Sequence, residues 1–321
     1  MPTTHETVPA SFPSALTEGE WRILLSRIRS GRCTPFIGGE AAFGVLPSRS
    51  DIARELAIKY NYPLEDSHDL ARVAQFLATG DKEHPGDPLL PRMEIVERLR
   101  AVPPPDFTDS NEPHRILADL PLAVYATTNY DDLMYKALRH RQRNPRRELC
   151  RWNEAIPGEA TPLEEPTVAN PVVFHIHGYV NIISAQRSEM EESLVLTEDD
   201  YLDFLISTSR SPNLIPSHIQ SAFAGASLLF LGYRLTDLEF RVLLRSLVGY
   251  LNKSIGRPHM SVQIIQVEET VSTEEQNARM AAARAYLSQY CEAAPLHIRV
   301  CWTTQTFLTE LRQRWETFNG S

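Results

Sequence analysis

The sequence contains no long hydrophobic run. None of the apolar stretches in its 321 residues approaches the roughly 18 residues that a membrane-spanning helix needs. The segment from Met1 to Ser14 also lacks the basic start and apolar centre of a secretory signal. We therefore expect a cytoplasmic protein that binds no membrane.

Closely spaced cysteines are also missing. The cysteines lie far apart and form no Cys-x-x-Cys pair: Cys33, Cys150, Cys291 and Cys301. A structural zinc ribbon needs four thiolates or imidazoles at close, paired spacing. The sequence therefore predicts reduced, mostly buried cysteines and no bound metal.

An excess of positive charge is absent too. The formal net charge is −9, whereas nucleic-acid binding depends on a basic face. One segment, residues 139–151, holds six arginines. It predicts a solvated loop or helix end, and the alternative is a contact with nucleic acid or an acidic partner. We do not expect direct nucleic-acid binding by the chain as a whole.

The sequence does contain a regular alternation of short apolar runs and amphipathic segments. Strands that alternate with helices predict a parallel sheet with helices on both faces, so we expect a Rossmann-like α/β fold. The predicted strands cover residues 34–37, 122–126, 172–177, 193–196, 227–231, 262–267 and 297–302. The predicted helices cover residues 21–28, 50–60, 69–78, 93–102, 113–120, 132–139, 201–207, 215–224, 238–251, 273–290 and 305–318.

The chain divides into a short arm and one large domain. Residues 1–16 are rich in proline and threonine and predict a flexible N-terminal arm. Residues 17–321 are expected to form the domain. The helical segment between its first two strands, about residues 51–120, is longer than a plain crossover requires.

Three predicted strands end in residues that could hold a ligand. The first runs into Gly38 and Gly39, the second into Thr128 and Asn129, and the third into His177. Ligands of open α/β sheets bind in the crevice outside the carboxyl ends of the strands. On the residues alone a second interpretation stays open, in which the polar groups after the second strand only cap the next helix. A lone strand histidine is likewise often a structural group.

Four motifs in this order resemble the sirtuin-like NAD-hydrolysing family of bacterial antiphage defence. They read FIGGEAAFGVLPSR, TTNYDD, HIHGY and LFLGYRLTDLEFR, and the resemblance covers roughly residues 32–241. It implies that residues 51–120 contribute a small helical module beside the nucleotide cleft. It also implies that NAD binds as a substrate to Gly38, Gly39, Gly44, Arg49, Thr128, Gly232 and Tyr233.

The resemblance assigns the chemistry to three side chains. Asn129 would orient a water and the nicotinamide ribose, because its amide both donates and accepts hydrogen bonds. His177 would contact the ribose hydroxyls or act as general base, and Asp131 would accept from the nicotinamide carboxamide. The bond between ribose and nicotinamide would break through an oxocarbenium-like state. The expected enzyme is therefore an NAD+ hydrolase that releases nicotinamide and ADP-ribose.

Three residues depart from the family pattern. Glu40 stands where a second glycine is usual, Ala42 where a serine is frequent, and Arg234 where the family has a small hydroxyl residue. A carboxylate beside a diphosphate weakens binding unless a cation pairs with it, and we expect Arg32 or Arg49 in that role. These departures favour the alternative of an NAD- or ADP-ribose-binding scaffold subunit with little turnover. The missing zinc ribbon disfavours a third possibility, an NAD-dependent protein deacylase.

The resemblance also implies partners. A single sirtuin-like domain with no visible sensor implies a separate activator, such as a hexameric DNA-translocase ATPase or, alternatively, a short Argonaute protein. The arginine-dense segment and the proline-rich arm lead us to expect a homo-oligomer or a larger complex. The expected role is depletion of NAD in infected cells once the partner has activated the enzyme.

Overall fold

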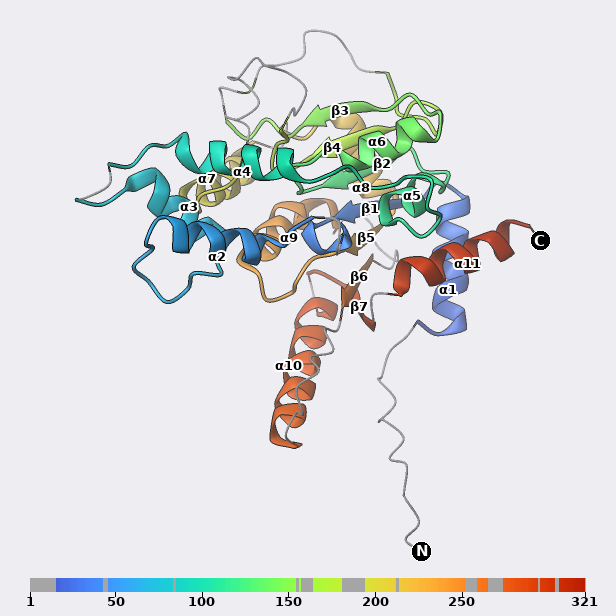
Figure 1. Ribbon diagram of the computed structural model, residues 1–321. Helices are drawn as coiled ribbons and strands as arrows, with labels where there is room; N and C mark the ends of the chain where they lie inside the picture. The colour runs from blue at the N-terminus through green and yellow to red at the C-terminus, as the bar shows by residue number, and fades with distance from the viewer. Residues whose placement is uncertain are drawn as a thin grey trace, which may run out of the picture.

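The computed structural model describes residues 16–42, 46–82, 85–153, 156, 164–180, 194–211, 214–251, 259–264, 274–293, 295–303 and 306–320. Within these residues, seven strands form one parallel sheet in the order β3-β4-β2-β1-β5-β6-β7. Helices surround the sheet, as Figure 1 shows. The expected Rossmann-like α/β fold is confirmed.

The elements have the following bounds. The strands are β1 (Cys33–Ile37), β2 (Val124–Thr127), β3 (Arg146–Leu149), β4 (Val172–His175), β5 (Ser227–Leu231), β6 (His259–Ile264) and β7 (Ile298–Thr303). The helices are α1 (Glu18–Arg29), the 3-10 turn η1 (Gly39–Ala42), α2 (Arg49–Lys59), α3 (Leu70–Thr79), α4 (Leu90–Ala101), α5 (Pro113–Ala118), α6 (Leu133–His140), α7 (Glu198–Arg210), α8 (Ser217–Gly225), α9 (Leu238–Leu251), α10 (Glu274–Glu292) and α11 (Phe307–Asn319).

Successive residues of the strands face two different layers, as the pleat requires. Phe36 of β1 packs against Phe223 of α8, in a core that also includes side chains of α7, α9 and α10. The next residue, Ile37, belongs to the opposite core, which is built with α1, α5, α6 and α11. Both faces of the sheet are therefore buried, which explains why its strands read as continuous apolar runs.

The position of β1 at the centre of the sheet determines where a site can form. Its last residue, Ile37, lies opposite Thr127 of β2 and Leu231 of β5. The carboxyl ends of these parallel strands meet at one edge of the sheet. The glycine turn, the TTNYDD turn and the LGYR turn therefore leave the sheet side by side.

Helices α2, α3 and α4 form a hydrophobic cluster of their own at this edge, and α3 packs against α7 (Figure 1). The cluster includes Tyr130 from the turn after β2 and Leu196 from the segment before α7. These helices fall within the range in which a helical module was expected. The division into an arm of residues 1–16 and a domain stays a prediction, because residues 1–15 lie outside the described part.

The arginine-dense segment does not form the expected loop along its whole length. Residues 146–149 are the edge strand β3, which pairs with β4. Several of its arginines are engaged within the chain. Arg143 donates to the carbonyl of Leu120 and Arg147 to the carboxylate of Asp132, at 2.6 and 3.1 Å. The loop prediction for residues 146–149 is therefore wrong, because the local sequence did not reveal pairing with a distant strand.

The prediction of a strand at residues 193–196 is also wrong for the residues that the structure describes. Residues 194–196 are buried but irregular. Val195 donates its backbone N–H to the carbonyl of His177, and its own carbonyl accepts from the Tyr130 hydroxyl. Leu194 and Leu196 pack into the cluster of α2, α3 and α4. The segment is therefore as apolar as a buried strand, but it does not pair with the sheet. The other predicted elements are confirmed where the structure describes them, with ends shifted by a few residues, and residues 265–267, 273 and 305 of the predicted elements lie outside the described part.

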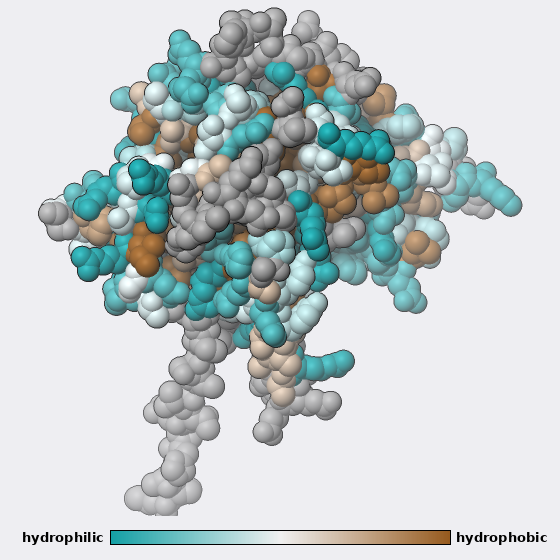
Figure 2. All heavy atoms as spheres, turned by 180° about the vertical axis from the view of Figure 1, so that it is seen from behind, coloured by the Kyte–Doolittle hydropathy of each residue, from teal (hydrophilic) through white to brown (hydrophobic). Residues whose placement is uncertain are grey.

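In the part of the chain covered by the structure, no helix combines the length and apolarity needed to span a bilayer. Seen from behind, hydrophobic side chains reach the surface in separate groups among hydrophilic ones (Figure 2). Large hydrophobic side chains that are exposed somewhere on the surface include Ile58 on α2 and Leu202 on α7.

Candidate functional site

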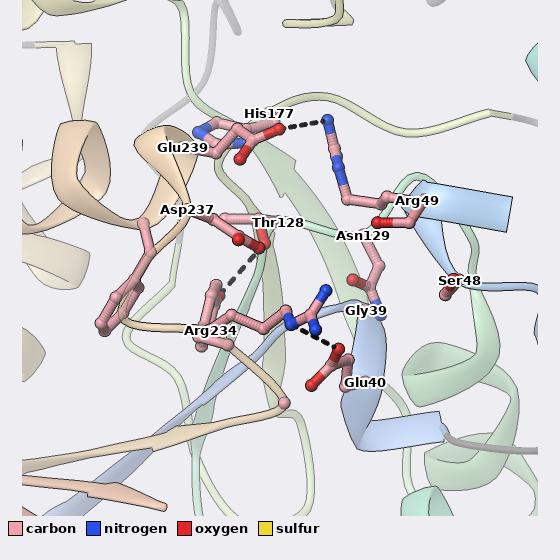
Figure 3. A pocket seen from close by; sticks show the side chains of 14 residues that line it. Gly39, Glu40, Ser48, Arg49, Thr128, Asn129, His177, Arg234, Asp237 and Glu239 are labelled. Atoms are coloured by element: carbon pink, nitrogen blue, oxygen red, sulfur yellow. Dashed lines mark hydrogen bonds and ion pairs between the residues drawn. The ribbon is translucent and has the colours of Figure 1, made fainter. Parts of the chain in front are cut away.

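A pocket lies at the carboxyl ends of β1, β2 and β5, between the N-terminus of α2 and the start of α9 (Figure 3). This is the crevice in which open α/β sheets bind ligands. The described residues that line it are Gly39, Glu40, Ser48, Arg49, Ser50, Thr128, Asn129, His177, Gly232, Tyr233, Arg234, Asp237, Glu239 and Phe240. Most of the predicted site residues are therefore brought together here.

Two glycine turns form the floor of the pocket by packing backbone against backbone. A Cβ added at Gly38 would lie 2.6 Å from the carbonyl oxygen of Gly232. Gly232 itself has a φ of +72°, and a Cβ there would lie 2.0 Å from the backbone nitrogen of Ala41. Gly38 thus supports the pocket from below, while Gly39 lines it. The predicted ligand residue Gly44 lies outside the described residues.

The TTNYDD turn holds Asn129 in the pocket. Thr127 donates its hydroxyl to the carbonyl of Ile37 at 2.9 Å and accepts the backbone N–H of Asn129 at 3.0 Å. The Asn129 amide donates to the carbonyl of Gly38 at 3.4 Å. Thr128 donates to the Tyr233 hydroxyl at 3.2 Å, which links this turn to the LGYR turn.

Asp131 does not lie among the described residues that line the pocket. Its Oδ1 accepts the backbone N–H of Leu133 at 2.8 Å, at the start of α6. Burial raises the pKa of its carboxyl, and the nearby His114 opposes that shift. This bond to the first residue of α6 supports the capping interpretation for Asp131, and its contact with a nicotinamide carboxamide stays a prediction.

His177 lines the pocket as a buried imidazole, with 1% of its surface exposed. Its ring meets Tyr201 and Phe204 of α7 edge-to-face, at centroid distances of 5.3 and 5.1 Å. Neither ring nitrogen has a hydrogen-bond partner among the described residues. Burial, and next the charge of Arg49, lower the pKa of His177 to about 3. The imidazole is therefore neutral at physiological pH and free to bond with a ligand.

His175 has different surroundings. It packs against Tyr179 at 4.9 Å and is fully buried. Burial is the main reason why its pKa is lowered to about 4. It does not line the pocket, so of the two histidines in HIHGY only His177 is placed at the site.

Arg49 is held by three elements at once. Its Nη2 donates to the Tyr201 hydroxyl at 2.8 Å and lies 3.3 Å from Oε1 of Glu239, and its Nη1 donates to the Tyr130 hydroxyl at 3.3 Å. The residue before it, Ser48, begins α2 in a capping box with Asp51. Arg49 is therefore fixed at the pocket wall by both its helix and its contacts.

The cation beside Glu40 is not the one expected. Glu40 pairs with Arg234, with 3.3 Å between Oε1 and Nε, whereas Arg49 pairs with Glu239. Arg32 precedes β1 and so lies at the opposite edge of the sheet from Glu40. The expectation of Arg32 or Arg49 is wrong because the LGYR turn packs directly on the turn that carries Glu40. Figure 3 shows the two ion pairs at opposite ends of the pocket.

The pocket holds three carboxylates and two guanidinium groups. Asp237 lies at its rim, and burial together with the charge of Glu239 raises its pKa to about 6. Burial also raises the pKa of Glu40, while Arg234 opposes the shift. Both cations are therefore already paired with carboxylates that an anionic ligand would have to displace.

Sequence reasoning missed the α7 contribution. Tyr201 and Phe204 lie three residues apart on one helical face, a spacing typical of any buried stripe. Nothing in their own sequence indicates that this face meets His177. Glu239 lies within the fourth motif, but its pairing with Arg49 depends on the fold.

Comparisons with known proteins fit this placement. A family model described as a SIR2-like domain matches residues 123–290, just over half of the chain. A protein of Enterococcus faecium named "NAD(+) hydrolase ThsA" is 30% identical over 51% of this chain and 30% of its own length. Proteins of the same name from Cytobacillus dafuensis and Acinetobacter baumannii are 30% and 23% identical, over 65% and 58% of this chain and 36% and 33% of their own. The chain spans about a third of the length of these relatives.

Proposed function

Since the chain belongs to the SIR2-like family, we propose that it is an NAD+ hydrolase that cleaves NAD to nicotinamide and ADP-ribose. The observation that carries this proposal is the convergence of Asn129, His177 and Arg49 on one pocket at the carboxyl ends of the central strands. The names of the relatives as NAD(+) hydrolases support it.

The reaction does not require a strong nucleophile from the protein. The bond between ribose C1′ and the pyridinium nitrogen breaks, its electron pair goes to nicotinamide, and an oxocarbenium-like ribose remains. A water adds at C1′ and loses one proton. Asn129 is proposed to orient this water and the ribose. His177, which is neutral at physiological pH, is proposed to accept a hydrogen bond from the water or a ribose hydroxyl.

The dinucleotide would be held by groups on both sides of the pocket. Gly39 and Gly232 allow a close approach to the backbone, and Thr128 and Tyr233 lie between them. Arg49 and Arg234 are proposed to bind anionic oxygens of NAD after exchanging their carboxylate partners. Asp131 is left out of this mechanism because its carboxylate bonds the backbone of Leu133 and it is not among the described residues that line the pocket.

The second candidate is an NAD- or ADP-ribose-binding scaffold with little turnover. The observation that favours it is the pairing of both pocket cations with Glu40 and Glu239, which opposes entry of a diphosphate. A deacylase is disfavoured, because the four cysteines that a zinc ribbon would draw on are separate, buried thiols.

The biological setting is proposed from the relatives and the sequence motifs. The enzyme would deplete NAD in bacterial antiphage defence, in the cytoplasm and as a homo-oligomer. A separate activator would switch it on, either a hexameric DNA-translocase ATPase or a short Argonaute protein.

Incubation of the purified protein with NAD tests both candidates. Nicotinamide and ADP-ribose would be quantified by chromatography, without partners and with each candidate activator, and binding would be measured by calorimetry. Release of nicotinamide without an acyl substrate supports the hydrolase. Binding without release supports the scaffold, and absence of both under every condition overturns the assignment of the pocket.

A further inference from the structure

We propose that Tyr201 is a positioning residue, which holds the Arg49 guanidinium next to the His177 imidazole and fixes both for catalysis. This inference rests on the proposed function, because it concerns the same pocket. It assigns a role to a residue of α7, which lies outside all four sequence motifs.

Tyr201 touches both groups with different parts of one side chain. Its hydroxyl accepts from Nη2 of Arg49 at 2.8 Å, and its ring meets the His177 ring edge-to-face at 5.3 Å and 87°. The side chain is 2% exposed. A rigid, buried ring with one polar tip can therefore set the distance between a cation and an imidazole.

The helix that carries Tyr201 is itself anchored. Thr197 and Asp200 form a capping box at the start of α7, and Asp200 also receives two hydrogen bonds of 3.0 Å from Arg92 of α4. Phe204, one turn later, also meets the His177 ring edge-to-face, at a centroid distance of 5.1 Å. These contacts fix the start of α7 and with it the position of the Tyr201 side chain.

The charged and titratable groups around the Arg49 guanidinium show what the Tyr201 hydroxyl holds in place. Arg49 comes from α2, Tyr130 from the TTNYDD turn, Tyr201 from α7, and Glu239 from α9. Asp237, at the rim, also interacts with Arg49. Without the Tyr201 hydroxyl, Arg49 would lose the shortest of its hydrogen bonds among the described residues, and its guanidinium would no longer be fixed relative to His177.

The chemical consequence concerns protonation and orientation together. Arg49 adds to burial in lowering the pKa of His177. Burial is the larger cause and would remain, so a displaced Arg49 would raise that pKa only part of the way toward its ordinary value. The imidazole would then be protonated over a wider pH range and would accept a hydrogen bond less often.

Tyr201→Phe tests this, because it removes the hydroxyl and keeps the ring. Tyr125→Phe is the matched control, since the Tyr125 hydroxyl also accepts from an arginine, Arg143 at 3.0 Å, but in the core on the other face of the sheet. We expect Tyr201→Phe to lower kcat/KM for NAD cleavage about tenfold or more and to move the acid limb of its pH profile to higher pH. Tyr125→Phe should leave the pH profile where it is.

A second readout needs no turnover. The His177 ring signal, assigned by its loss in His177→Gln, would be followed by NMR against pH, and it should titrate at higher pH in Tyr201→Phe than in the wild type. If the wild type releases no nicotinamide, the proposed function fails while this titration still decides the role of Tyr201.

Non-additivity provides the last criterion. If Tyr201 acts through Arg49, combining Tyr201→Phe with Arg49→Gln should move the His177 titration no further than Arg49→Gln alone. Titration of Tyr201→Phe at the wild-type pH, or full additivity in the double variant, overturns the proposal. If Tyr201→Phe loses its fold, shown by thermal unfolding, an unchanged His177 titration in Arg49→Gln equally overturns it.

Discussion

Arg234 and Glu40 form an ion pair at one end of the pocket, with 3.3 Å between Nε and Oε1. Each residue departs from the pattern that the sequence resemblance implies, and each lies on one of the two glycine turns that pack against each other. The two departures therefore compensate one another. The pocket keeps the charge balance that a glycine and a small hydroxyl residue would give.

Breaking this pair from its two sides should change NAD affinity in opposite directions. Arg234→Gln leaves Glu40 unpaired beside the bound diphosphate and should weaken binding about fivefold, or ~1 kcal/mol, as is reasonable for a half-exposed pair. Glu40→Gln frees Arg234 and should tighten binding by a similar factor. Calorimetry at two salt concentrations measures both, and the differences should shrink at high salt. Weakening by both single substitutions would contradict the pairing argument.

Asn129→Ala and His177→Ala should each abolish detectable NAD cleavage while the chain stays folded. Positioning and proton transfer each contribute about 10² to 10⁴ in rate. Asp131→Asn is the contrasting variant. The new amide oxygen can still accept the Leu133 N–H, and the residue does not line the pocket, so its rate should change less than tenfold. Nicotinamide release, with thermal unfolding as a control, checks all three. Wild-type rates in Asn129→Ala or His177→Ala would remove the catalytic assignment.

Asp237 should make the stability of the protein depend on pH. Its pKa rises from 3.8 to about 6 on folding, so between these values the folded state binds more protons than the unfolded state. The free energy of unfolding should therefore fall as pH rises from about 4 to 6. Asp237→Asn should match the wild type near pH 4 and exceed it by roughly 1–2 kcal/mol at pH 7.5.

Urea denaturation at the two pH values measures this difference. Asp203→Asn, on the exposed face of α7, is the control and should leave the pH dependence unchanged. A variant at position 237 that parallels the wild type at both pH values would show that this carboxyl does not cause the dependence.

Gly232→Ala should be far more destabilising than Gly31→Ala. Both glycines have positive φ, +72° and +65°, so both substitutions incur the cost of a left-handed conformation, about 1–2 kcal/mol. A Cβ at Gly31 has nothing within 4 Å, whereas at Gly232 it would lie 2.0 Å from the nitrogen of Ala41. The clash should add a further 1–3 kcal/mol or so. Urea denaturation compares them, and equal losses would mean that the two turns separate easily.

The sequence predicts the sheet well because its central strands are buried on both faces. Runs such as Ser227–Leu231 are short, continuous and apolar. A run of this kind between turn residues is typical of a strand that is buried on both faces. The edge strand β3 reads RREL and has no such pattern. Its pairing with β4 depends on a contact between distant parts of the chain, which a local window does not contain.

For the site, the sequence predicts the residues that follow strand ends but not the side-chain contacts between distant segments. Gly39, Thr128, Asn129 and His177 follow strand ends, and parallel strands bring such ends together. Asp131 follows the same strand end, but the turn directs it to the N–H of Leu133. The partners of Arg49, by contrast, come from α7, α9 and the turn after β2. Side-chain geometry of the folded protein selects them, and no spacing in the sequence reveals it.

The pairing of β1 with β5 has a consequence for the chain during its synthesis. Cys33 of β1 lies opposite Ser227 of β5. One of the two neighbours of the central strand is therefore synthesised almost 200 residues after it. Until then a nascent chain carries the first glycine turn and Asn129, but neither Tyr233 nor Glu239 has been made. The two walls of the pocket can therefore meet only after residue 239 has been made. A nascent chain that stops before β5 carries only one of them.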